Sequence, residues 1–254
     1  MPSYNRVVTR YENGITEVVD YENTLEYGYT RISPDSEKIK SNGRLKLGRI
    51  KGKKDYFKET NVFKNCIRAQ KKIRQLCNNN TSLLSKFVTL TFASDFTEND
   101  ISQANYLFKK FINRLNYRIS KQDSSFKLEY LVVPELTKRG IIHYHMLCNL
   151  PYIDVEKLQD IWNYGIIYIN KIDDIDNVGA YISSYVEKDF GKCLPGSKHF
   201  FKSSGVVYPT PVKLMSNEDT ENYDFDNLTY ASKNENFYCG QVNTRIYDEN
   251  FFWD

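Results

Sequence analysis

The sequence predicts an α+β protein with a central antiparallel β-sheet and helices packed on one side. Segments with the period of a strand alternate with segments of helical period, in the order strand, helix, two strands, helix, strand, helix. The two consecutive strands are joined by residues 136–140, a short connection that ends in glycine and permits only an antiparallel pair. With 41% hydrophobic and 15% aromatic residues, a chain of 254 residues can bury a substantial core.

The N-terminal part begins with residues 1–57, which are polar and rich in tyrosine, and whose alternation indicates one or two hairpins. A helix is expected from Thr60 to about Asn78, because apolar residues recur at helical spacing while basic residues fall on the other side. The basic residues on that other side are Lys64, Arg68, Lys71 and Lys72. One side of the helix therefore suits a protein core, and the other could lie along a phosphate backbone.

The central part begins with a strand, KFVTLTF, whose Thr89 and Thr91 share one face. Thr97 and Asp100 resemble a capping box that opens a helix running to about Leu115. The remaining expected elements are strands KLEYLVVPE and IIHYHMLC, a short helix over 155–162, a strand over 164–170 and a helix over about 174–189. The tail beyond residue 194 is strand-like and acidic.

Charge is distributed unevenly along the chain, although the formal net charge is only +3. Residues 38–74 contain 14 Lys and Arg but only two acids, which suits binding to a polyphosphate backbone. A solvated basic surface or a flexible tail explains this charge equally well. No segment has the ~18 uninterrupted apolar residues of a membrane span, and no secretory signal pattern is present. The five cysteines contain no C-x-x-C pair, which favours a reducing cytoplasm over a disulfide framework.

Two of the three histidines, His143 and His145, are separated by a single residue within an expected strand. Strand alternation places both imidazoles on one face and Tyr144 on the other. Histidines satisfied by hydrogen bonds in a core would give the same pattern, so the pair alone leaves both interpretations open.

A third possible metal ligand is Glu135. If the hairpin is symmetric about Lys138, Glu135 pairs with Ile141 and Val133 pairs with His143, so Glu135 projects from the face that carries both histidines. Two imidazoles and a carboxylate on one face predict a site for Mg²⁺ or Mn²⁺ with open coordination positions. A register slip of one residue would turn the carboxylate away, and an exposed carboxylate paired with a neighbouring cation is the alternative.

The last expected helix contains two tyrosines and a lysine on one stripe. Tyr181 and Tyr185 are one turn apart, and Lys188 lies one turn beyond Tyr185. In a chain with 20 tyrosines such a pair is usually a packing feature. Beside a metal it has a chemical meaning, because a phenol is a poor nucleophile at neutral pH unless a nearby cation stabilises its oxyanion.

Together these motifs resemble the HUH endonuclease superfamily, specifically the rolling-circle replication initiators (Rep proteins) of bacterial plasmids and single-stranded DNA phages. FVTLTF matches the first motif of the family, HYH at His143 matches the second, and YVEK at Tyr185 with Tyr181 one turn before matches the third. The acidic metal ligand of the family falls on Glu135. The resemblance covers about residues 60–210.

The resemblance implies an HUH/Rep core with a ferredoxin-like or RRM-like sheet over residues 81–200. An N-terminal extension, 1–80, would carry the hairpins and the basic DNA-binding helix, and a β-rich C-terminal extension would cover 201–254. The implied activity is metal-dependent nicking and rejoining of single-stranded or hairpin DNA at a replication origin. It would proceed through a 5′-phosphotyrosine intermediate and leave a 3′-OH primer.

The resemblance also implies a role for each residue. His143, His145 and Glu135 would hold Mg²⁺ or Mn²⁺, Tyr185 or Tyr181 would attack the phosphate, and Lys188 would orient it. Tyr185 is the expected first nucleophile because of its spacing from the lysine. The expected DNA contacts are Thr89, Thr91, Lys64, Arg68, Lys71, Lys72 and Arg139. Ordinary strand filling explains the two threonines at least as well.

The expected setting is the cytoplasm of a bacterial host. No G-x-x-x-x-G-K-[ST] motif is present, so a host helicase and DNA polymerase are the expected partners. Two alternatives stay open, and a third, a metal-dependent hydrolase acting on small molecules, does not explain the basic stretch. A single-strand transposase of the same superfamily shares the chemistry, but usually has one tyrosine and a shorter chain. A non-catalytic origin-binding protein would use the basic helix alone.

Overall fold

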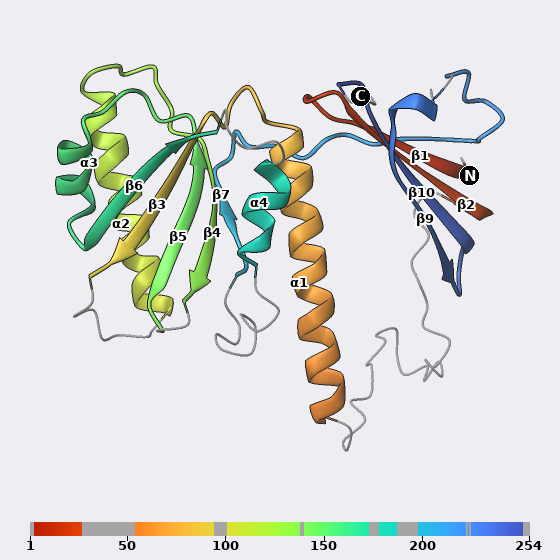
Figure 1. Ribbon diagram of the computed structural model, residues 1–254, viewed down its shortest axis with the longest axis horizontal. Helices are drawn as coiled ribbons and strands as arrows, with labels where there is room; N and C mark the ends of the chain where they lie inside the picture. Colours follow the sequence, from red (N-terminus) through yellow and green to blue (C-terminus); the bar gives the residue numbers. More distant parts are fainter. Residues whose placement is uncertain are drawn as a thin grey trace, which may run out of the picture. The chain divides into compact units, whose positions relative to one another are not determined.

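The computed structural model describes residues 3–26, 54–93, 101–137, 140–172, 178–186, 198–221, 223 and 225–250. The chain divides into two compact units. A terminal unit combines Met1–Lys58 with Thr210–Asp254, and a core unit comprises Glu59–Pro209. Each unit contains a five-stranded antiparallel sheet (Figure 1).

The sheet of the core unit has the strand order β6-β3-β5-β4-β7. Its strands are β3 (Lys86–Phe92), β4 (Tyr130–Leu136), β5 (Ile142–Cys148), β6 (Gly165–Lys171) and β7 (Phe201–Lys202). The first four agree with the strands expected from the alternation of apolar residues. β3 and β5 are central, and β6 forms one edge of the sheet.

Within the described residues, the helices that accompany this sheet are α1 (Lys54–Asn78), α2 (Ile101–Ser120), α3 (Val155–Trp162) and α4 (Val178–Ser184). α1 begins earlier than the expected Thr60. The described part of the last helix ends at Ser184, because the next two backbone N–H groups bond three residues back, which tightens the final turn. Tyr185 therefore follows the helix instead of lying within it. The expected capping box at Thr97 lies outside the described residues. No helix in the described part of the chain combines the length and apolarity needed to cross a membrane.

The α+β class and the central antiparallel sheet are confirmed, but the helices cover both faces of the sheet instead of one. α2 and α3 pack on the face that carries Val88, Leu90 and Phe92. α1 and α4 pack on the opposite face, over a cluster that includes Phe87 and Leu147. The reason is that this second face is apolar along one half of its length, and that half must be covered. The polar half of the same face carries the residues of the candidate site.

The sheet of the terminal unit has the order β8-β1-β2-β10-β9. Its strands are β1 (Ser3–Arg10), β2 (Ile15–Glu26), β8 (Val212–Leu214), β9 (Leu228–Asn236) and β10 (Gly240–Asp248). The hairpin β1–β2 agrees with the expected N-terminal hairpin. The division into extensions 1–80 and 201–254 differs from the structure, because β10 pairs with β2 and joins both chain ends in one sheet, while most of α1 belongs to the core unit.

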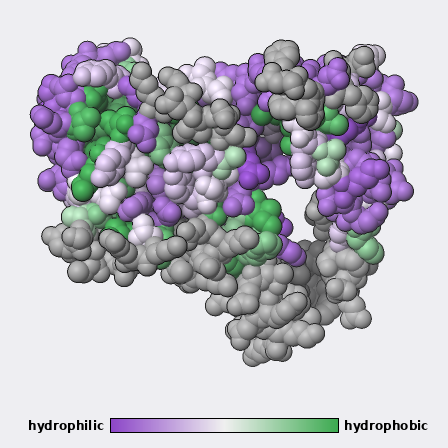
Figure 2. All heavy atoms as spheres, viewed as in Figure 1, coloured by the Kyte–Doolittle hydropathy of each residue, from purple (hydrophilic) through white to green (hydrophobic). Residues whose placement is uncertain are grey.

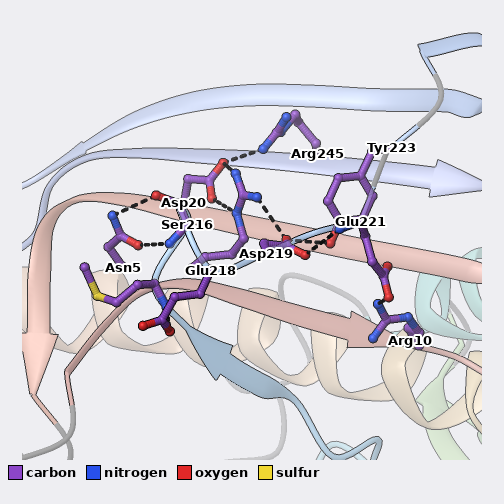
Figure 3. Close-up of polar contacts among 11 residues, drawn as sticks. Asn5, Arg10, Asp20, Ser216, Glu218, Asp219, Glu221, Tyr223 and Arg245 are labelled. Carbon is purple, nitrogen blue, oxygen red and sulfur yellow. Dashed lines mark hydrogen bonds and ion pairs between the residues drawn. The ribbon is translucent and has the colours of Figure 1, made fainter.

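A charged network crosses one face of the terminal sheet (Figure 3). Asp20 accepts hydrogen bonds from Arg6, at 2.5 Å, and from Arg245. Arg6 also donates to Asp219, at 2.9 Å. The apolar cluster of this unit is small and has Val8, Val18 and Tyr247 as its buried residues. The network therefore connects strands from both chain ends where few apolar residues are available.

Candidate active site

The hairpin β4–β5 places Glu135 directly opposite His143, and Val133 opposite His145. The register expected from a turn centred on Lys138 is therefore wrong by two residues. The turn is longer by two residues on its C-terminal side, so that the last strand pair is Leu136 with Ile142. A shift of two residues keeps a side chain on the same face. The shared face of the carboxylate and the two imidazoles is therefore retained.

These three side chains form a compact cluster. One ligand atom from each of Glu135, His143 and His145 lies within 4.8 Å of the others. Nε2 of His145 is 2.7 Å from Oε2 of Glu135, and the His145 side chain is buried whereas the other two are half-buried. Two imidazole nitrogens and a carboxylate converging from one side fit a hard or borderline divalent cation and leave other coordination positions open. The cluster could therefore hold a metal ion.

The electrostatics of the cluster favour the forms that bind metals. The hydrogen bond from His145 lowers the pKa of Glu135 below its ordinary value, although partial burial opposes this. Burial lowers the pKa of His143, and the neighbouring His145 acts in the same direction. A carboxylate and a neutral imidazole are the ligand forms of these side chains.

The central strand β3 supports the cluster from its other side. Thr89 is paired with His145, and Thr91 with His143. Oγ1 of Thr89 lies 3.3 Å from Nδ1 of His145. When Nε2 faces an ion, the proton is on Nδ1, and this N–H can donate to the threonine hydroxyl. Thr89 thus orients the imidazole.

Both tyrosines lie next to the cluster. The Tyr185 ring stacks on the His145 ring, with centroids 3.6 Å apart and an interplanar angle of 14°. The Tyr185 hydroxyl donates to the Tyr181 hydroxyl at 2.7 Å. Burial and this hydrogen bond raise the pKa of Tyr185 well above its ordinary value. The Tyr185 phenol therefore keeps its proton at neutral pH unless a cation stabilises the phenolate.

The segment that carries the tyrosines is held by α1. Nε of Arg74 donates to Oγ of Ser183 at 3.1 Å, and the Gln70 side chain donates to the carbonyl of Val186 at 3.2 Å. Gly179 permits close approach, because a Cβ there would be 3.3 Å from the Arg74 Cα. These positioning residues were not among those predicted from the sequence. A glycine inside the last expected helix was the only local signal for them.

The other expected site residues have separate positions. The side chains of Lys64, Arg68, Lys71 and Lys72 are all exposed on α1. Thr91 is half-buried opposite His143. Lys188 and Arg139 lie outside the described residues, so their roles stay predictions.

Comparison with protein-family models gives a match over part of the chain. Residues 85–190 match the model of replication-associated protein ORF2/G2P. The matched range contains the triad and both tyrosines. It confirms the resemblance to replication-associated proteins and supports a role in replication initiation and an interaction with origin DNA. No curated protein and no solved structure matches the chain significantly.

Proposed function

We propose that this protein initiates rolling-circle replication by nicking one DNA strand at an origin and later rejoining it. The observation that carries this proposal is the stacking of Tyr185 on His145, which places a phenol beside a candidate metal ligand. The family match over residues 85–190 supports the replication role. In this proposal Glu135, His143 and His145 hold Mg²⁺ or Mn²⁺.

The proposed reaction is a transesterification at phosphorus. A tyrosine Oη loses its proton to solvent and forms a bond to the scissile phosphorus, the bond from phosphorus to the 3′ oxygen breaks, and that oxygen takes up a proton from solvent. The products are a 5′-phosphotyrosine and a free 3′-OH, which a host polymerase extends behind a host helicase. Glu135, His143 and His145 would hold the metal ion, which when bound would supply charge stabilisation for the phosphate. Reversal of the same step rejoins the strand.

The chain's own residues prepare the nucleophile. Thr89 orients the His145 ring, and that ring positions Tyr185 by stacking. The hydrogen bond between the phenols joins Tyr185 to Tyr181, so the two hydroxyls are close enough together to reach the same phosphate. One tyrosine can then hold a 5′ end while the other attacks the regenerated origin. Lys188 is proposed to orient the phosphate.

DNA binding outside the reacting centre is assigned to α1 and β3. The exposed cations of α1 are proposed to contact the phosphate backbone, which makes binding weaken as salt is raised. The α1 cations in this proposal are Lys64, Arg68, Lys71 and Lys72. Arg139, outside the described residues, is proposed to contact the backbone as well. Thr89 and Thr91 are proposed to line the floor of the DNA groove.

The test is a search for a covalent protein–DNA adduct. The full chain is incubated with Mn²⁺ and a library of labelled single-stranded oligonucleotides, and the products are separated on denaturing gels. We expect an adduct that EDTA abolishes and that the double variant Tyr181→Phe/Tyr185→Phe does not form, because no phenol oxygen is then available near the metal. Tyr152→Phe, which removes an exposed hydroxyl in the loop before α3, is the matched control and should retain the adduct.

The single variants rank the two nucleophiles. We expect Tyr185→Phe to lose more adduct than Tyr181→Phe. Binding of a cognate oligonucleotide that survives EDTA and the double variant, with no adduct under any condition, would instead indicate a non-catalytic DNA-binding protein.

A further inference from the structure

Two exposed side chains with large apolar parts lie on the same sheet face as the cluster of Glu135, His143 and His145. The edge strand β6 exposes Ile166 and Tyr168, which are 52% and 59% accessible, whereas Ile167 between them is 4% accessible and belongs to the core. Figure 2 shows hydrophobic surface among hydrophilic residues in the region where β6 lies in Figure 1. Single exposed apolar residues are common. Two exposed residues of this kind on one face of a strand, next to a candidate site, are less common.

The strand register aligns this pair with the candidate site. Two rows of directly paired residues cross from β6 over β3 to β5. They are Tyr168, Thr89 and His145 in one row, and Ile166, Thr91 and His143 in the other. Adjacent strands are about 4.8 Å apart, so β6 lies roughly 10 Å from the histidine strand. This spacing is close enough for one strand of DNA to contact both the cluster and β6.

The other direction along this face is covered. Tyr185 stacks on His145, and α4 packs over Phe87 in the apolar half of the face. The exposed surface next to the cluster is therefore on the β6 side. Neither of the two rows contains a lysine or an arginine, so this part of the surface is suited to bases instead of phosphates.

We propose that Tyr168, flanked by Ile166, is a stacking platform for an unpaired base next to the nucleotide that is cut. This inference rests on the proposed nicking function. It assigns to Tyr168 the selection of single-stranded DNA for that reaction. An aromatic ring stacks on any base, because every base has a π-face, but the base must be free of its own stack to reach the ring. A regular duplex offers no such base, so the platform selects single-stranded or extruded DNA.

The test measures base-dependent binding without catalysis. The full chain carries Tyr181→Phe and Tyr185→Phe, EDTA is present, and binding is followed by fluorescence anisotropy. One probe is a fluorescein-labelled oligodeoxythymidylate of about 20 nucleotides, longer than most single-strand sites. The other is an abasic oligomer of equal length, with the same phosphates and no bases. Tyr168→Ala should weaken binding of the first probe by roughly tenfold and leave the second nearly unchanged.

Two control variants separate stacking from other effects. Tyr168→Phe keeps the ring and should bind the first probe within about twofold of the parent, which also shows that the strand is intact. Tyr117→Ala removes an equally exposed tyrosine, 59% accessible, from α2 on the opposite side of the sheet, and should have no effect.

Three results would overturn the platform. One is an equal loss of affinity for both probes, another is a loss no larger than that of Tyr117→Ala, and the third is conversion of a dimer to a monomer by Tyr168→Ala in light scattering. The third would identify β6 as a contact between two copies of the chain. Because neither nucleophile nor metal is present, failure to form an adduct in the nicking experiment leaves this measurement valid, and the reverse also holds.

Discussion

His145 is the residue through which the parts of the candidate site meet. Its Nε2 contacts Glu135 on β4, its Nδ1 contacts Thr89 on β3, and its ring stacks on Tyr185 and is also a neighbour of Phe87. A single imidazole thus links two strands of the hairpin, the central strand and the tyrosine segment. Any change that rotates this ring is expected to affect both metal binding and the position of the nucleophile.

The threonine beneath this ring provides a test at the residue scale. Thr89→Val preserves shape but removes the hydroxyl next to Nδ1, which would accept the Nδ1 proton when Nε2 binds an ion, so the imidazole loses a partner that holds its orientation. We expect the Mn²⁺ affinity to fall roughly tenfold, as measured by isothermal titration calorimetry, with little loss of thermal stability. Thr91→Val changes the neighbouring threonine on the same strand face and is the control. Equal losses for the two variants would contradict the assigned role of Thr89.

At the scale of elements, α4 depends on its surroundings. A helix of seven residues has almost no stability of its own, because nucleation costs more than so few hydrogen bonds return. Contacts with α1 through Gly179, Ser183 and Val186 replace this missing stability. The tyrosine spacing is therefore a local property, whereas the position of the tyrosines over the sheet is a property of helix packing.

The segment after β7 is anchored by a buried carboxylate. Glu129 accepts a hydrogen bond from the backbone N–H of Gly205 at 2.7 Å and pairs with Lys127 at 2.9 Å. A Cβ at Gly205 would collide with the Glu129 carboxyl group, so a larger residue there would displace the carboxylate from this position. Burial works against the charged form, but the hydrogen bonds from Ser203, Lys127 and Gly205 together lower the pKa of Glu129.

This pKa shift predicts a pH-dependent stability. A carboxyl group whose pKa is lower in the folded state stabilises the fold above its unfolded pKa of about 4.3, and this stabilisation is lost as the pH falls through the folded pKa. We expect Glu129→Gln to lower the free energy of unfolding by about 1–2 kcal/mol at neutral pH, and by less below about pH 4. Urea denaturation at both pH values measures the difference, and a pH-independent difference would disprove the assignment.

At the scale of the whole molecule, the chain forms two units with different sources of stability. The core unit has large apolar clusters on both faces of its sheet. The terminal unit has a small apolar cluster around Val8, Val18 and Tyr247, and relies in part on the ion pairs of Asp20. A charge removed from this network should therefore affect one unit selectively.

Asp20→Asn tests this expectation. It leaves Arg6 and Arg245 without their shared carboxylate in a half-buried position, and we expect a loss of about 1–2 kcal/mol in the stability of the terminal unit. Hydrogen exchange should show reduced protection in β1, β2 and β10 and unchanged protection in β3 and β5. Asp248→Asn, on the same sheet, is a control of equal charge change. Loss of protection in both units would show that they unfold as one.

The sequence alone was sufficient to predict features that depend on residues close together in the chain. Alternation predicted β3 to β6, helical period predicted α1, and the short hairpin predicted that Glu135 shares a face with His143 and His145. The error of two residues in the register arose because the turn length depends on local backbone hydrogen bonds that residue types do not specify. The face was still correct because side chains repeat every two residues along a strand.

Only the tertiary structure decided which distant segments meet. The pairing of β10 with β2, the packing of α1 on α4 and the stacking of Tyr185 on His145 join residues far apart in the chain. Local periodicity contains no information on these contacts, because they arise when apolar surfaces of separate elements are removed from water together. Sequence motifs thus identified the chemical groups of the candidate site, and long-range packing determined the geometry in which they can act.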